Sequence, residues 1–530
     1  MSNHLSVRSR FIALALTLFF GLFIASPAHS AVKSGAACKK IGQTSIAADK
    51  KYTCIKSGKK LLWDKGLPIS KLNLPEKPNQ STKPEVLPTA PEKQPVINEG
   101  DTCNQSINPK VMMSDGNLYC VMHSDGNSRY IKMLTKAPVI QNPKSPETIR
   151  ACMPPDLRGG IAEGSFRWAI TYPAGPVTLK NSGDLNIAIV PIDFSDVNGN
   201  EPPTDIYLSD MKKMSSWFQD YSNGKLKLTF QESSKWYRAA KTTEFYNVGE
   251  GINLGKDGRT IPQISQEFVD RAKADFDFSK ADAIFFIYPK GTPAITNSFA
   301  SQFILQAGST SKSFFTVGAS SSNRLYGPLW TYLTHEMLHY MGITMHFPVN
   351  PPQWGIEWGG FTPTPVLNPW NQAILDWMND DQYYCVSSQN LTDTKVTLLP
   401  VENPGPGIHS ALIRVSNSES LLIVSHRKGT WSEGVPDSFY GVMTALIDTS
   451  KQTSWIAENT GQDQFDGLIY PKSGIYLHPT RTWNTPRIWT RTEIGDWGAL
   501  MFLGDSVTYK GVQIKVVSSN NFDTIQISRQ

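Results

Sequence analysis

The chain has 530 residues, of which 40% are hydrophobic and 18% are charged, and its formal net charge is +5. At roughly 150 residues per domain, this length predicts three or four structural units. The positive excess is too weak to argue for nucleic acid or an anionic membrane as a partner, so we expect neither.

The N-terminus, residues 1–30, has the features of a secretory signal peptide. Two arginines precede a mostly apolar run over residues 11–25, which a Ser-Pro pair ends. The small residues that follow predict cleavage between Ser30 and Ala31. The run is shorter than the stretch of about 20 residues that crosses a membrane, and no second run of that length follows. We therefore expect a secreted or envelope-associated protein without a stable membrane span, the alternative being an uncleaved anchor.

Six cysteines follow the leader, and an even number in an oxidising compartment predicts three disulfides. An internal repeat groups the first four, because residues 35–63 resemble residues 100–130. Each copy has a glycine before its first cysteine, a second cysteine 16 or 17 residues on, a tyrosine before that cysteine (Tyr52, Tyr119) and an aromatic residue at its end.

This repeat favours one of the 15 pairings that six cysteines allow. Cys38 would pair with Cys54 and Cys103 with Cys120, within two small modules over residues 31–66 and 100–135. Cys152 and Cys385 would then close the central region.

The modules are separated by a linker rich in Pro, Lys and Glu over residues 67–99, and a second linker covers residues 136–151. The first module is rich in lysine, which is compatible either with binding to a cell-wall polymer or with an ordinary solvated basic face. Six of its lysines form the adjacent pairs Lys39 and Lys40, Lys50 and Lys51, and Lys59 and Lys60.

From residue 152 to residue 386 the pattern is that of an α/β domain, in which apolar runs of strand length alternate with segments of helical spacing. The expected strands cover 185–194, 225–230 and 281–288, and the expected helices cover 206–221, 261–274, 328–342 and 368–378. Short β-rich runs parted by turn signals then predict an all-β, sandwich-like domain over residues 387–530.

The motif that carries chemistry is HEMLH, residues 335–339, inside the third expected helix. His335 and His339 stand at positions i and i+4, so both imidazoles lie on one face and can reach one zinc ion. Glu336 lies about 100° away around the helix, which suits a general base acting on a metal-activated water better than a third ligand. The alternative is a pair of ordinary helix histidines.

The sequence leaves the third zinc ligand open. Gly342 lies three residues after His339, and His346 lies seven residues after His339. A turn at the glycine can therefore bring the chain back toward the ion. This is the metzincin pattern with one extra residue before the last histidine, and it makes His346 the preferred ligand. Glu357, eighteen residues beyond His339, and Asp376 are the alternatives.

Four features over about residues 180–530 resemble the immune inhibitor A-like secreted bacterial metallopeptidases and, more distantly, gametolysin-type enzymes. They are THEMLHYMG, VLNPWNQAILDWM, WFQDYSNGKLKLT and the distal runs LLIVSHRKG, GVMTALIDTS and LGDSVTYKGVQIKVVS. The resemblance implies a zinc endopeptidase with His335 and His339 as ligands and Glu336 as base. The chain departs from the family at Met345, where an aspartate is frequent, and in having WGIEWGG where a methionine-bearing turn is expected.

Together these features predict an α+β multi-domain chain. Two disulfide-stapled modules precede a metzincin-like α/β zinc peptidase domain and an all-β domain. The expected function is a secreted Zn²⁺-dependent endopeptidase that hydrolyses protein or peptide substrates. The alternative is a catalytically inert cell-envelope binding protein that retains a degenerate peptidase fold.

Overall fold

The structure is a computed structural model, and the expected signal peptide and most of the first linker lie outside the residues that it describes. The chain divides into two compact units, Met1–Gln94 and Pro95–Gln530. The described residues are 33–38, 43–47, 50–57, 60–65, 67–68, 97–104, 107–108, 110–114, 116–122, 128–134, 139–155, 179–246, 255–256, 258–292, 299–307, 310–320, 328–343, 356, 364–432, 440–450, 462–465, 468–471, 474–477 and 500–530.

The first unit holds the first disulfide-stapled module. Strand β2 pairs with three neighbours, and the Cys38–Cys54 disulfide packs with Tyr52 and Trp63 in a very small core. So few buried side chains supply little hydrophobic stabilisation, and the covalent link therefore has a large part in holding the module together. Its strands are β1 (Thr44–Ala47), β2 (Lys50–Ser57), β3 (Lys60–Trp63) and β4 (Leu67–Pro68).

The second module repeats the hydrogen bonds of the first. Its strands are β5 (Lys110–Met113), β6 (Gly116–Met122) and β7 (Ser128–Leu134), with the Cys103–Cys120 disulfide. The Gly35 N–H donates to the carbonyl of Trp63, and the Gly100 N–H donates to that of Tyr130, each at 2.8 Å. The predicted repeat is thus visible in the backbone.

One detail of the repeat differs from the prediction. The sequence comparison matched Tyr52 with Tyr119, but the buried position two residues before the second cysteine holds Tyr52 in one module and Leu118 in the other. Tyr119 stands one residue later on the strand and is half-buried, because successive strand residues point to opposite faces.

The second unit contains a six-stranded sheet in the order β10-β8-β11-β13-β12, with β9 also beside β8. All of its pairs are parallel except β12–β13, an antiparallel hairpin that the sequence had not predicted. The strands are β8 (Gly183–Asp193), β9 (Leu226–Gln231), β10 (Tyr237–Arg238), β11 (Ala283–Tyr288), β12 (Phe299–Ala307) and β13 (Thr310–Ser320).

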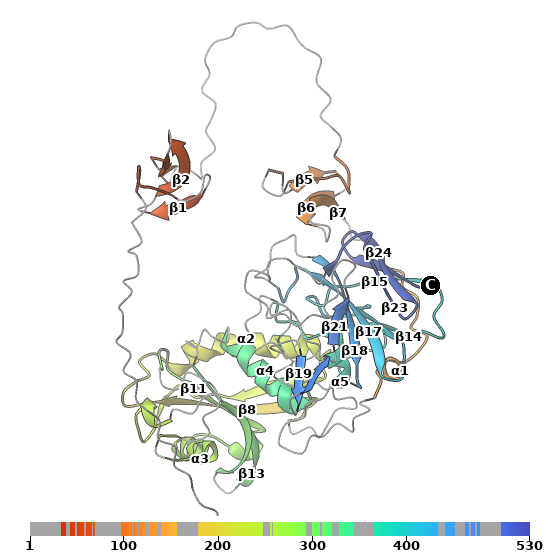
Figure 1. Cartoon of the computed structure of the whole chain (residues 1–530). Coiled ribbons are helices and arrows are strands. Elements are labelled where there is room, and N and C mark those ends of the chain that lie inside the picture. The colour runs from red at the N-terminus through yellow and green to blue at the C-terminus, as the bar shows by residue number, and fades with distance from the viewer. Residues whose placement is uncertain are drawn as a thin grey trace, which may run out of the picture. The chain divides into compact units, whose positions relative to one another are not determined.

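Helices cover both faces of this sheet (Figure 1), and β8 shows why. Its side chains alternate, so that Ile187 and Ile189 pack with α2 and α4 while Val190 and Ile192 pack with α3. The helices described in this unit are α1 (Ile149–Cys152), which lies against β14 and β16, α2 (Pro203–Tyr221), α3 (Ile261–Ala272), α4 (Leu329–Met341) and α5 (Pro369–Ile374), with 3-10 turns at Thr243–Tyr246 and Phe278–Lys280.

Three expected helices, at 206–221, 261–274 and 328–342, correspond to α2, α3 and α4. The fourth is shorter than expected. We predicted a helix over 368–378, but α5 ends at Ile374 and Asp376 has a φ of 62°, a left-handed conformation that a helix does not tolerate.

The described part of the C-terminal region has strands and no helices, and it forms two main sheets, β14-β16-β17-β18-β21 with β22, and β15-β25-β24-β23, together with the hairpin β19-β20. Strand β14 pairs with β16 and runs across the expected domain border at residues 386 and 387. The strands are β14 (Tyr383–Ser387), β15 (Thr394–Leu398), β16 (Ser410–Arg414), β17 (Glu419–Arg427), β18 (Tyr440–Asp448), β19 (Gln462–Phe465), β20 (Leu468–Pro471), β21 (Gly474–Leu477), β22 (Leu500–Met501), β23 (Ser506–Tyr509), β24 (Val512–Ser519) and β25 (Asp523–Arg529).

Strand β17 explains how this region meets the helices. Every one of its residues is buried. Leu421 and Ile423 pack against the second sheet, whereas Leu422 and Val424 point to the other face and share a core with α2 and α4. The region around the α/β sheet and the C-terminal sheets are therefore joined by one continuous hydrophobic core.

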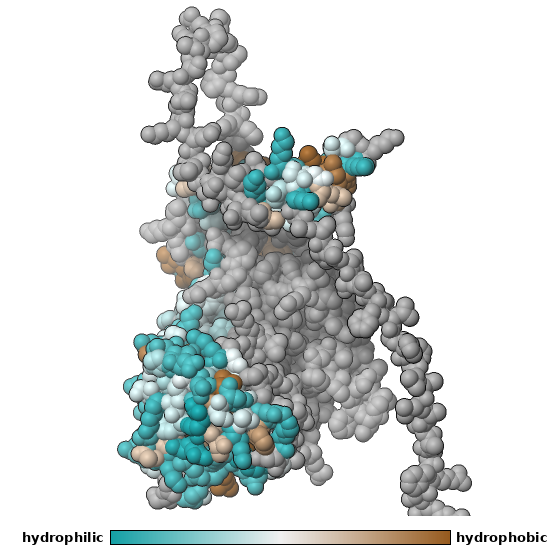
Figure 2. All heavy atoms as spheres, turned by 90° about the vertical axis from the view of Figure 1, so that its left-hand side faces the viewer, coloured by the Kyte–Doolittle hydropathy of each residue, from teal (hydrophilic) through white to brown (hydrophobic). Residues whose placement is uncertain are grey.

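The predicted disulfides and the broad fold class are confirmed. All six cysteines are paired as the repeat favoured, including Cys152 with Cys385. The chain is an α+β multi-domain protein with many sheets and few helices. Within the described part, no helix is both long and apolar enough to cross a membrane. The described surface that faces the viewer in Figure 2 is mostly hydrophilic, with hydrophobic side chains in small groups.

Candidate metal centre

Helix α4 carries the HEMLH motif, and hydrogen bonds close both of its ends. Its N-cap, Pro328, offers no side-chain oxygen, and the carboxylate of Asp210 on α2 instead accepts the N–H of Trp330 at 3.1 Å. At the other end Gly342 has a φ of 123°, and the Ile343 N–H donates back to the Leu338 carbonyl at 3.0 Å. This is the glycine-dependent helix end that the sequence predicted.

The two histidines of the motif face each other. The Nε2 atoms of His335 and His339 lie 3.1 Å apart, and the rings are nearly perpendicular, at 82°, with centroids 4.6 Å apart. His335 is buried and His339 is half-buried. The i, i+4 spacing therefore places the two ring nitrogens close together.

Both rings are also held from behind by backbone carbonyls. The Nδ1 of His335 lies 2.9 Å from the Ile356 carbonyl oxygen, and the Nδ1 of His339 lies 2.8 Å from that of Ile343. A carbonyl only accepts, so each Nδ1 has to carry the proton, and each Nε2 then presents a lone pair. Metal-binding histidines are oriented in this way by a carbonyl or carboxylate behind the ring.

The number of protons limits how the two rings can contact each other. Three close contacts, two to carbonyls and one between the rings, require three protons, but two neutral imidazoles carry only two. A cation between the two Nε2 atoms, or a proton added to one ring, would suit this short contact.

The geometry fits zinc. Two nitrogens 3.1 Å apart, each about 2.05 Å from one ion, subtend an angle of about 98°, which is close to the tetrahedral value. A neutral imidazole whose other nitrogen donates to a carbonyl is also a common zinc ligand. His335 and His339 would hold the ion.

The two carbonyls that contact the histidine rings belong to Ile343 and Ile356, and hydrogen bonds of the backbone hold both residues in place. Ile343 follows the Gly342 turn directly, so the same helix end that stops α4 also orients His339. Ile356 is fully buried, and its N–H donates to the carbonyl of Val366 at 2.9 Å. It belongs to the WGIEWGG segment, which the sequence comparison had placed where the family has its methionine-bearing turn.

Glu336 is the next residue on α4 and is half-buried. It stands one helical step from His335, about 100° around the axis, as the sequence analysis expected. The carboxylate is thus attached to the same rigid helix as both rings.

The preferred third ligand, His346, and the alternative Glu357 lie outside the described residues. Among the residues that the structure does describe, no group of three or more His, Cys, Asp or Glu side chains gathers around one point. Asp376, the remaining alternative, lies beyond α5 with its side chain 83% exposed and forms an ion pair with Arg150 at 2.9 Å. That carboxylate is therefore engaged at the surface.

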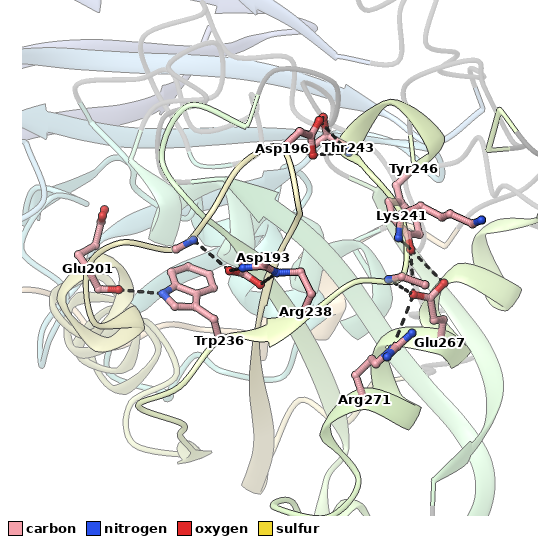
Figure 3. Close-up of polar contacts among 12 residues, drawn as sticks. Asp193, Asp196, Glu201, Trp236, Arg238, Lys241, Thr243, Tyr246, Glu267 and Arg271 are labelled. Carbon is pink, nitrogen blue, oxygen red and sulfur yellow. Dashed lines mark hydrogen bonds and ion pairs between the residues drawn. The ribbon is translucent and has the colours of Figure 1, made fainter.

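A second polar cluster, which the sequence analysis missed, lies where β8 and β10 end (Figure 3). Asp193 accepts two hydrogen bonds from the Arg238 guanidinium, each 2.7 Å long, and a third from the Gly199 N–H. Nearby, Glu267 accepts from the Ala240 N–H and the Tyr246 hydroxyl. These carboxylates serve the fold, because each binds neighbouring backbone or side-chain donors.

Comparison with known proteins adds no assignment. No family model matches the chain, and no curated protein matches it.

Proposed function

We propose that this protein is a zinc-dependent endopeptidase with a metzincin-like catalytic region. One observation carries the proposal: the Nε2 atoms of His335 and His339 converge to 3.1 Å while each Nδ1 faces a backbone carbonyl. Two oriented neutral imidazoles on one helix, beside a carboxylate, form the core of such a site. The third ligand would be His346.

The chemistry that this arrangement supports is hydrolysis of a peptide bond. Zinc, when bound, lowers the pKa of water toward 7 and polarises the substrate carbonyl. Glu336 would accept a proton from the attacking water and return it to the leaving amine. The buried surroundings of α4 would keep bulk water away and strengthen these electrostatic interactions.

The test separates the base from the ligands. Glu336→Gln removes the base but keeps both histidines, so the variant retains zinc and loses casein cleavage, by a factor of at least about 100. Glu232→Gln makes the same change of charge at an exposed residue and serves as the matched control. Wild-type cleavage should stop with a chelator and return with zinc.

Undiminished cleavage by Glu336→Gln would defeat the proposed mechanism. A wild-type protein that binds zinc stoichiometrically but cleaves no protein or peptide would favour the alternative, an inert cell-envelope binding protein with a retained metal site.

A further inference from the structure

The positive charge of this protein is concentrated in the first module. Residues 31–66 contain nine lysines and two aspartates, a net charge of +7, whereas the whole chain carries +5. The other 494 residues therefore have a net charge of −2. The two aspartates of the module can neutralise only two of its nine lysine charges.

The second module provides an internal comparison, because its strands β5, β6 and β7 pair in the same order as β1, β2 and β3 but the module as a whole carries no net charge. Residues 100–135 contain three acidic and three basic residues, a net charge of zero. When Cys54 is matched with Cys120, Lys50 and Lys56 correspond to Gly116 and Met122. The scaffold therefore does not require these lysines, and their accumulation in one copy calls for a binding role.

The lysines that the structure describes in this module are exposed and spread out. Lys50 and Lys56 stand six residues apart on β2, a separation of about 20 Å along the strand. Lys60 lies on the neighbouring strand opposite Ser57. The aspartate of the described part, Asp64, accepts the Thr53 N–H at 3.0 Å. The exposed lysines are Lys33, Lys50, Lys56, Lys60 and Lys65.

The composition of the module narrows the class of partner. Its two aromatic residues, Tyr52 and Trp63, are buried at 8% and 7% exposure, so neither offers a free ring on which a nucleobase could stack. The module contains no arginine, and hence none of the forked donors that match a planar carboxylate with two hydrogen bonds. Lysine binds phosphate as a point charge. Lysines spaced along a surface therefore suit a polymer in which phosphate groups repeat at regular intervals.

We propose that the first module binds a linear phosphodiester polymer without nucleobases, through the exposed Lys50, Lys56, Lys60 and Lys65. The module would then attach the protein to an anionic polymer, and the proposed peptidase region would act on its own substrate. This proposal is independent of the peptidase activity.

The experiment uses the full-length secreted chain and poly(glycerol phosphate) as the probe. With about four phosphate contacts and a salt slope of about −0.7 for each, affinity should fall about 50-fold between 50 and 200 mM salt. The variant K50Q/K56Q/K60Q/K65Q should bind at least about 50-fold more weakly at 50 mM salt and lose most of that salt dependence.

The matched control removes four exposed lysines from the second unit, in K212Q/K227Q/K395Q/K515Q, and so makes the same change of net charge. It should bind the polymer as the wild type does. Equal weakening in both variants would overturn the proposal, because binding would then follow total charge. Tighter binding to single-stranded DNA, to a polyuronate or to phosphatidylglycerol vesicles than to poly(glycerol phosphate) would also overturn it.

Discussion

Replacing Gly342 by alanine tests whether the end of α4 orients the metal site. Gly342 has a φ of 123°, a conformation that side-chain-bearing residues rarely adopt, and Ile343 directly after it holds the Nδ1 of His339 at 2.8 Å. Alanine in such a backbone costs about 1–2 kcal/mol, and the strain is relieved by moving the turn. Moving the turn shifts the Ile343 carbonyl away from the ring.

The expected loss of metal affinity follows from the role of that carbonyl. Removing a group that orients a metal-binding histidine costs about 10–100-fold in affinity, which is about 1.4–2.8 kcal/mol. We therefore expect Gly342→Ala to weaken zinc binding by this factor, measured by competition with a chromophoric chelator at pH 7.5. The melting temperature of the metal-free protein reports the strain separately.

The control is Gly504→Ala, which places the same strain in the C-terminal sheets. Gly504 has a φ of 93° and open space where a Cβ would stand. This variant should lose comparable stability and keep its zinc affinity. If Gly342→Ala binds zinc as tightly as Gly504→Ala does, the helix end does not orient His339 and the reasoning fails.

Three further outcomes can be measured. His346→Ala should lower the zinc content of the purified protein, and full occupancy by elemental analysis would move the third ligand elsewhere. Replacing Cys152 and Cys385 by alanine removes a disulfide that spans a sequence separation of 233. In the chain-entropy model this should lower the free energy of unfolding by about 5.5 kcal/mol, measured by urea denaturation. A loss of less than about 2 kcal/mol would count against that model. Burial lowers the pKa of His409, so the folded protein binds a proton at this ring less readily than the unfolded chain does. The free energy of unfolding of the wild type should therefore fall as the pH drops below about 6.5. A His409→Gln variant with the same dependence of stability on pH would contradict this.

Local patterns in the sequence were enough to predict helix α4, the position of His335 and His339 on one face of it, and the turn at Gly342. Each depends on residues within one or two helical turns of one another, where spacing fixes direction. The cysteine repeat was similarly informative, because two copies with matched spacing reduce the choice of pairings.

The contacts that complete the site could not be predicted. The rings of His335 and His339 are held by backbone carbonyls, and any residue type can supply a carbonyl, so neither Ile343 nor Ile356 carries a signal in the sequence. Asp210, which caps α4, lies 120 residues before Trp330. Such pairings are set by how α2 packs on α4.

The shared core was predictable in part. The run ESLLIVSHR does not alternate hydrophobic and polar residues, as a strand with one solvent-exposed face does. Its continuous apolar centre, LLIV, indicates a strand that is buried on both faces. The sequence analysis used it only to place an all-β region. Which elements cover the second face of β17 depends on tertiary packing with α2 and α4.

Zinc stoichiometry tests the central claim most directly. The purified protein, loaded with equimolar zinc and dialysed, should retain about one zinc per chain by elemental analysis, whereas the double variant His335→Gln/His339→Gln should retain close to none. A wild-type protein free of zinc after this treatment, or a double variant that holds as much zinc as the wild type, would contradict the account.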